Sequence, residues 1–296
     1  MSTAYKLDPP ALPPTVDELA RMVSDVSPVS FVARRVMELL EQETVSAEEV
    51  THVISRDQGL AAKILRQANS PLYGLTREVT SIGWAITLLG TNTVKNIVIT
   101  AAFCNLYRKG GLAEKLMWEH ALACAIGGKL LALQFDPRAS ELAFVGGLLH
   151  DLGKTIFQTA TAKIYAPVLA ECYTGKISFR TVEQEVYKFT HAELGARVLL
   201  HWKMPKEIAQ LARYHHLDQD NSIEDCVEAS VQNALFCVIL ANALVKRIPL
   251  GYMEANDELE RSGLIAARHF NLSDEDLLQW QRKIEATFEN EQLRFR

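Results

Sequence analysis

The sequence lacks any paired-cysteine motif, because its five cysteines are scattered, odd in number and without a CxxC pair. This pattern predicts free thiols in a reducing compartment and excludes both a disulfide framework and a zinc site built from cysteines. A surplus of basic residues is also missing, since the formal charge at pH 7 is −5. No general attraction to nucleic acid or to anionic lipid is therefore expected, and no basic helix with interleaved aromatics suggests a nucleic-acid partner.

Long apolar runs and targeting signals are missing as well. The longest apolar stretch, residues 234–241, is too short to cross a bilayer and predicts a buried helix. The first ten residues lack the basic-then-apolar layout of a signal peptide. A chain of 296 residues with 48% hydrophobic and 23% charged residues can bury a substantial core. We expect a soluble, cytoplasmic protein with no membrane partner.

The fold class predicted by the apolar pattern is all-α. Apolar residues recur at spacings of three and four, without the sustained alternation that is typical of strands. Capping boxes mark two helix starts, at Ser46 and Thr190, and Gly90 is expected to end a helix. The pattern predicts helices near residues 15–23, 32–40, 46–54, 60–68, 82–89, 94–106, 112–135, 139–149, 159–172, 181–189, 191–202, 206–214, 229–246 and 273–288.

Breaks in this pattern suggest two helical lobes. The polar, glycine-containing segment at residues 108–111 is the expected boundary between them. The predicted parts are an extended arm (1–14), an N-terminal helical lobe (15–110), a second helical lobe (111–250) and a C-terminal helical tail (251–296). The tail places the apolar side chains from Leu277 to Phe288 on one face of a helix. Most such stripes pack back on the parent domain, and a homodimer contact is the alternative.

Several short elements of the first lobe come in a specific order. They read Asp57-Gln-Gly-Leu60, Leu65-Arg-Gln-Ala-Asn69-Ser70, Tyr73-Gly74, Ser81-Ile82, Ala85-Ile86 and Leu89-Gly90. From the residues alone, Asn69 and Ser70 are expected to form hydrogen bonds at a helix end, and Gly74 and Gly90 to form turns. Taken together, the elements resemble the HDOD family, the HD-related output domain of bacterial signalling proteins. The resemblance implies the fold and gives none of these positions a catalytic role.

An adjacent His150-Asp151 pair ends an apolar helix in the second lobe. An imidazole and a carboxylate at a helix end can turn toward one cation, but this dipeptide alone is weak evidence. Further histidines fall at helix ends or beside small residues, namely His120, His191, His215 and His216. Neutral imidazoles on separate helices around a His-Asp pair are the composition of a site for one or two divalent ions such as iron, manganese or zinc.

The order of these residues is similar to the HD phosphohydrolase superfamily, most closely its HD-GYP branch. The positions that the resemblance assigns to metal binding read His120, His150, Asp151, His191, His215, His216 and Asn242. Lys154 matches a lysine of that branch and would contact phosphate only in an enzyme. The closing aspartate of the pattern is Asn242 here, the gap before His191 is longer, and the Gly-Tyr-Pro element is absent. A neutral carbonyl oxygen in place of a carboxylate weakens cation binding and the activation of water.

The sequence therefore predicts two alternative functions. The first is a non-catalytic signalling or scaffold module of the HDOD type, which acts through other signalling proteins and carries a metal at a degenerate HD site. The second is a metal-dependent phosphohydrolase that acts on a nucleotide or a cyclic dinucleotide. The lost aspartate and the missing Gly-Tyr-Pro element favour the first.

Overall fold

The computed structural model describes residues 13–24, 35–36, 38–39, 46–69, 77–107, 111–175, 177–217, 227–248 and 257–292. Throughout these segments the regular structure is helical, so the predicted all-α fold class is confirmed. The helices are α1 (Val16–Ser24), α3 (Ala47–Ile54), α4 (Gln58–Ala68), α5 (Ile82–Tyr107), α6 (Leu112–Phe135), α7 (Ser140–Leu149), α8 (Leu152–Ala160), α9 (Ala162–Gly175), α10 (Phe179–Tyr187), α11 (His191–His201), α12 (Lys206–Tyr214), α14 (Ala229–Val245), α15 (Asp257–His269) and α16 (Asp274–Glu291).

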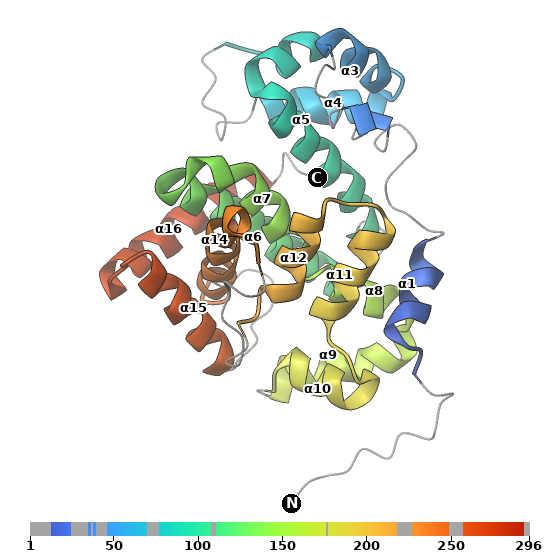
Figure 1. Ribbon diagram of the computed structural model, residues 1–296, viewed down its shortest axis with the longest axis vertical. Helices are drawn as coiled ribbons and strands as arrows, with labels where there is room; N and C mark the ends of the chain where they lie inside the picture. Colours follow the sequence, from blue (N-terminus) through green and yellow to red (C-terminus); the bar gives the residue numbers. More distant parts are fainter. Residues whose placement is uncertain are drawn as a thin grey trace, which may run out of the picture.

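Helices α3, α4 and the start of α5 form a small group at the top of Figure 1, and α5 then descends to a larger helical body. Asn69 holds the end of α4 in place, because its side chain pairs with both the backbone nitrogen and oxygen of Val79 at 2.7 and 2.9 Å. The expected role of Asn69 at a helix end is thus confirmed. Ser70, Tyr73 and Gly74 lie outside the described residues.

Helix α1 packs on the larger body, against α11 and α8, and not on α3 and α4 (Figure 1). An ion pair of 3.0 Å joins Asp17 of α1 to Arg197 of α11. The first described helix therefore covers elements that lie more than a hundred residues later in the chain. This contact could not be read from its amphipathic pattern, which says only that one face is buried.

Gly90 divides α5 into two helical parts, as the sequence predicts. Its φ of 76° and ψ of 162° lie outside the helical region, and glycine adopts such a positive φ without a steric penalty. By length and composition, the windows Ile82–Cys104 and Leu112–Phe135 could each cross a membrane. Since 56% and 78% of these windows, respectively, are buried inside the protein, they are weak evidence for membrane spans.

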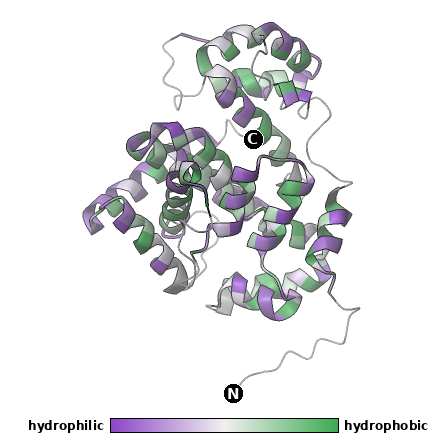
Figure 2. Cartoon of the chain, viewed as in Figure 1, coloured by the Kyte–Doolittle hydropathy of each residue, from purple (hydrophilic) through white to green (hydrophobic). Residues whose placement is uncertain are grey.

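The core of the larger body is formed by α6, α7 and α14, which pack closely on one another. Small residues permit this approach: a Cβ on Gly128 would lie 2.8 Å from the Ala143 oxygen, and one on Gly147 would lie 2.5 Å from the Cys124 oxygen. In Figure 2, hydrophobic residues are concentrated on α14 at the centre of the body, whereas α15 and α16 at its edge mix both kinds. The expected buried helix around residues 234–241 is thus found in α14.

The C-terminal helix α16 packs back on α6 and α14. It begins after Ser273, as predicted, with a capping box between Ser273 and Asp276, and Leu277, Ile284 and Phe288 are buried. A Cβ on Gly127 of α6 would lie 3.0 Å from Ile284 Cδ1, so the glycine makes room for this helix. The apolar stripe of α16 therefore packs on the rest of the protein, while a homodimer contact stays a prediction.

The helix predicted at residues 159–172 has different bounds in the structure, and another helix was missed. Residues 159–172 were expected as one helix after Lys154, but α8 already begins at Leu152 and α9 follows from Ala162. The apolar side chains of Leu152, Ile156 and Phe157 are all buried, at spacings that a helix places on one face. Helix α15 was not predicted. The four described cysteines are thiols outside any disulfide, as predicted, and all four are buried, while Cys226 lies outside the described residues.

Candidate metal centre

Six helices, α6, α7, α8, α11, α12 and α14, bring the donor residues predicted from the sequence to one buried place in the larger body. His120 lies in the middle of α6, and His191 is the first residue of α11. His150 and Asp151 form the corner between α7 and α8, where the first caps one helix and the second opens the next. His215 caps α12 and His216 follows it, while Asn242 belongs to α14.

The carboxylate of Asp151 lies at the centre of this group. Its Oδ1 is 3.3 Å from His191 Nε2 and 3.4 Å from His215 Nε2. Its Oδ2 is 3.3 Å from His150 Nε2 and 3.6 Å from His120 Nε2. Each oxygen therefore faces its own pair of imidazoles, an arrangement in which one carboxylate can serve two adjacent cations.

The outer nitrogen of two of these rings is fixed by the backbone. His150 Nδ1 lies 2.8 Å from the Gly147 oxygen, and His215 Nδ1 lies 2.8 Å from the Ala212 oxygen. A carbonyl oxygen can only accept, so both rings carry their proton on Nδ1. Nε2 points at Asp151 and is the ring nitrogen whose lone pair can bind a metal. Such an outer hydrogen bond is the usual support of an imidazole that binds a metal.

Glu183 plays the same part for His191, and sequence reasoning missed it. Its Oε2 accepts hydrogen bonds from the backbone nitrogen and from Nδ1 of His191, each at 2.7 Å. Its Oε1 accepts a hydrogen bond of 2.7 Å from the Tyr165 hydroxyl. Glu183 has no exposed surface. The signal was an acidic residue on the apolar face of the helix just before His191, beside Val182 and Val186.

Several polar atoms at the centre are buried without a hydrogen-bond partner. They are His150 Nε2, His215 Nε2 and Asp151 Oδ1. Such groups are costly in a folded protein unless a bound species satisfies them. The potential ligand atoms form two groups, Asp151 with His191, His215 and His216, and His120 with Cys124 and His150, whose members lie within 4.8 Å of one another. The residues thus fit a divalent metal that accepts nitrogen and oxygen ligands.

Electrostatics prepare these side chains for a cation. Burial lowers the pKa of His215 to about 3 and that of His120 and His216 well below the usual value, so these three imidazoles are neutral near pH 7. Burial by itself would raise the pKa of Asp151, but His150 and Lys154 hold it well below its usual range. An ionised carboxylate beside the neutral imidazoles of His120, His215 and His216 is the protonation state that a metal requires.

Two predicted residues complete the inner surroundings. His216 is partly exposed, and its Nε2 lies 3.0 Å from His191 Nε2. Asn242 is buried, with Oδ1 3.1 Å from His120 Nε2. Residue 242, where the family pattern has an aspartate, therefore faces the donor group with the neutral amide oxygen of Asn242.

Lys154, the residue expected to contact phosphate in an enzyme, has no exposed surface. Its Nζ lies 3.0 Å from Asp151 Oδ2 and 4.5 Å from the centroid of the Phe179 ring. The ammonium group is thus held between a carboxylate and an aromatic face. The remaining histidines, His52, His201 and His269, are exposed and were not expected to bind metal.

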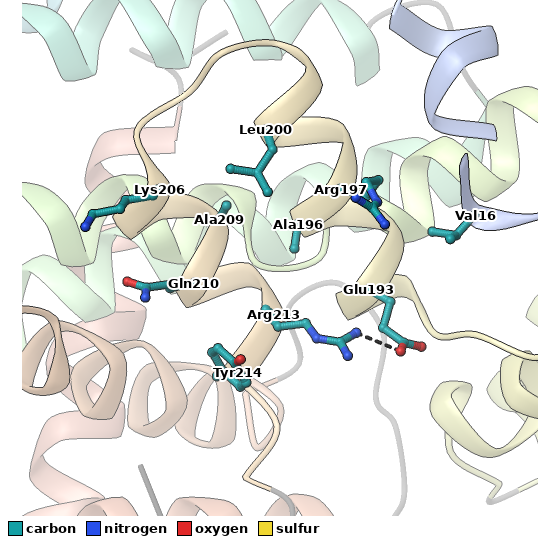
Figure 3. Close-up of a pocket in the computed structure, with 10 residues that line it drawn as sticks. All are labelled: Val16, Glu193, Ala196, Arg197, Leu200, Lys206, Ala209, Gln210, Arg213 and Tyr214. Atoms are coloured by element: carbon teal, nitrogen blue, oxygen red, sulfur yellow. Dashed lines mark ion pairs between the residues drawn. The ribbon is translucent and has the colours of Figure 1, made fainter. Parts of the chain in front are cut away.

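A pocket of about 380 Å³ is lined by residues of α1, α11 and α12, and Figure 3 shows the ten residues that line it. None of the predicted metal ligands is among them. Its basic side chains already have acidic partners: Arg213 pairs with Glu193 at 2.8 Å, as the dashed line in Figure 3 marks, and Arg197 pairs with Asp17 at 3.0 Å. The pocket is therefore separate from the candidate centre.

Comparison with known proteins points to one family. The model of the HDOD domain family matches residues 26–217. An HDOD domain protein of unknown function from Geobacter sulfurreducens is 25% identical, with 94% of each chain covered and a TM-score of 0.67. A protein from Shewanella amazonensis that is named a candidate phosphohydrolase is 20% identical, with 94% of this chain and 98% of that chain covered and a TM-score of 0.70. The second likeness shows the fold alone.

Two curated relatives are themselves uncharacterized proteins. One, from Treponema pallidum, is 21% identical over 67% of this chain and 39% of its own length. The other, YuxH from Bacillus subtilis, is 34% identical over 36% of this chain and 26% of its own length. The chain thus spans well under half the length of each.

Proposed function

The chain belongs to the HDOD domain family, and from this premise we propose that it is a non-catalytic regulatory module whose His-Asp centre binds a divalent metal. The observation that carries this proposal is the convergence of Nε2 atoms on both oxygens of Asp151, with their outer nitrogens held by the backbone or by Glu183. Iron, manganese or zinc would satisfy the buried donors that lack partners.

The surroundings of Lys154 support a role without catalysis. A phosphohydrolase needs a clamp on the substrate phosphate, and this ammonium group is fully buried and paired with Asp151. The donor at residue 242 is neutral, so the charge that would activate a bound water is reduced. Both features weaken hydrolysis more than they weaken metal binding.

A regulatory role follows from where the donors come from. A metal at Asp151 would join α6, the α7–α8 corner, α11 and the end of α12 through one shared group of ligands. Binding that occurs only in the folded state stabilises it by mass action. Gain, loss or oxidation of the metal would change the rigidity of this body and of surfaces offered to partner proteins. We propose signalling proteins as those partners and the cytoplasm as the location.

The alternative, a metal-dependent phosphohydrolase acting on a nucleotide or cyclic dinucleotide, is favoured by one observation. His216 is partly exposed while its Nε2 lies 3.0 Å from that of His191, so one side of the centre comes near solvent. A catalytic metal must keep a position open to water and substrate on such a side.

The deciding experiment measures bound metal and turnover in the same samples. Full-length protein without a polyhistidine tag is compared with Asp151→Ala and with Asp274→Ala, a change at an exposed carboxylate far along the chain. We expect near-stoichiometric metal that only Asp151→Ala removes, and no hydrolysis of phosphodiesters. Metal content below about a tenth of an equivalent would contradict the metal site. Hydrolysis that disappears in Asp151→Ala would establish the alternative.

A further inference from the structure

We propose that Cys124 is a ligand of this metal centre, where its sulfur joins His120 and His150 around the Oδ2 side of Asp151 and gives that side a preference for zinc, iron or cobalt. The inference rests on the proposed metal binding and adds to it a soft donor. Neither the sequence pattern of the histidines nor the family resemblance pointed to this residue.

The position of Cys124 is set by helix geometry. It follows His120 by four residues on α6, so both side chains lie on the same face of the helix. Cys124 Sγ lies 3.6 Å from His120 Nε2. With a zinc–nitrogen bond of about 2.05 Å and a zinc–sulfur bond of about 2.3 Å, tetrahedral coordination separates the two donor atoms by about 3.6 Å. The two side chains are therefore already spaced as ligands of one ion.

A second observation points to the same place. His150 Nε2 is completely buried and has no hydrogen-bond partner, and it belongs to the same group of donor atoms as the Cys124 sulfur. Its outer nitrogen is held by the Gly147 oxygen, so Nε2 cannot turn away. A metal bound by His120, Cys124 and His150 would satisfy this nitrogen.

Charge gives a reason for the thiol. In the two groups of potential ligands formed by the described residues, Asp151 is the only carboxylate, and Lys154 already neutralises part of it. Asn242 faces His120 with a neutral oxygen. Metal binding displaces the proton of a cysteine, so a thiolate at Cys124 would add the second negative charge that the site otherwise lacks.

Ligand type then decides which ions bind. Carboxylate, carbonyl and water suit magnesium and manganese, whereas a thiolate with imidazoles suits zinc, iron and cobalt. Without Cys124 the Oδ2 side offers only imidazole and oxygen donors, and the preference for softer ions should fall.

Cobalt(II) is the probe for the test, because a cobalt–thiolate bond gives a charge-transfer absorption band in the near ultraviolet. Full-length protein is loaded with cobalt and compared with Cys124→Ser, Cys124→Ala and Cys237→Ser. Cys237 lies on α14, is equally buried and belongs to neither group of donors. We expect the band in the unchanged protein and in Cys237→Ser, its loss in both Cys124 variants, and cobalt affinity more than about tenfold weaker in those variants.

The outcomes separate this inference from the proposed function. Cobalt that binds and depends on Asp151, but shows no thiolate band or keeps it in the Cys124 variants, overturns the role of Cys124 alone. Failure to bind cobalt at all, or equal binding by Asp151→Ala, overturns the metal site itself. Should both variants at Cys124 fail to fold, X-ray absorption of the zinc-loaded unchanged protein decides, since a sulfur neighbour lies at about 2.3 Å and nitrogen or oxygen at about 2.0–2.2 Å.

Discussion

Glu183 Oε2 accepts two hydrogen bonds from His191, one from its backbone nitrogen and one from its ring Nδ1, both at 2.7 Å. The same carboxylate fixes the first turn of α11 and the orientation of the His191 imidazole at the start of this helix. Because the proton is held on Nδ1, His191 Nε2 is available 3.3 Å from Asp151 Oδ1. A residue that touches no metal can in this way govern how well a metal binds.

Replacement of Glu183 by glutamine should weaken metal binding. The amide keeps the size of the side chain but accepts hydrogen bonds less strongly, so His191 is less firmly oriented. We expect the dissociation constant for the metal to rise by about 10–100-fold, as is common for outer partners of ligands. Competition with a chelator of known affinity measures it. Glu185→Gln, an exposed change on the same helix, is the control and should leave the constant unchanged; an equal effect of both changes would contradict the assignment.

The metal-free protein should lose stability as the pH falls below about 6.5. Burial lowers the pKa of His215 to about 3 in the folded state. The unfolded state therefore takes up a proton in this window that the folded state does not, and the free energy of unfolding falls by about 1.4 kcal/mol per pH unit for this imidazole. His120 and His216, whose pKa values burial also lowers, act in the same direction.

Urea unfolding of the metal-free protein at about pH 7.5 and about pH 5.5 measures this dependence. The variant His215→Asn cannot take up that proton, so its free energy of unfolding should depend less steeply on pH. Identical pH dependence in the two proteins would show that His215 is not held neutral by burial.

Substitution of Gly153 by alanine should disrupt the corner that carries Asp151. A Cβ at this position would lie 2.0 Å from the backbone oxygen of His191, so α8 and α11 would have to separate. We expect a loss of at least about 1–3 kcal/mol in the free energy of unfolding, because overpacking against backbone cannot be relieved by a side-chain rotation. Gly83→Ala, whose Cβ would meet only Thr51 Oγ1 at 3.6 Å, is the control for thermal or urea unfolding and should change stability little or raise it. A Gly153→Ala protein as stable as the control would mean that the two helices are not so closely packed.

Ile284→Ala should show that the C-terminal helix is part of the core. The Ile284 side chain is completely buried, and the contact with Gly127 joins α16 to α6. Loss of this volume should cost about 2–5 kcal/mol in the free energy of unfolding. Leu278→Ala, with a side chain 52% exposed on the same helix, should change it by less than about 0.5 kcal/mol. Equal effects of the two substitutions would indicate that α16 is not docked as described.

The sequence by itself determined the helical class, most helix bounds and the residue types of the centre. Apolar spacing predicted residues 112–135 and 206–214 as the helices that the structure shows, and the capping boxes at Ser46 and Thr190 form as expected. These features depend on periodicity and on hydrogen bonds between residues three apart, so they are local. The order of the histidines also predicted a metal site, because the ligand atoms that a side chain can offer are known from the residue type alone.

Only the tertiary structure decided what surrounds those histidines. Glu183 and Cys124 carry no motif, and their importance comes from distances of 2.7 Å to His191 and 3.6 Å to His120. The burial of Lys154 and the packing of α1 on α11 likewise depend on helices far apart in the chain. A helical pattern states which face is buried but not which helix covers it. The partners of a buried polar side chain are therefore set by the packing of the whole fold.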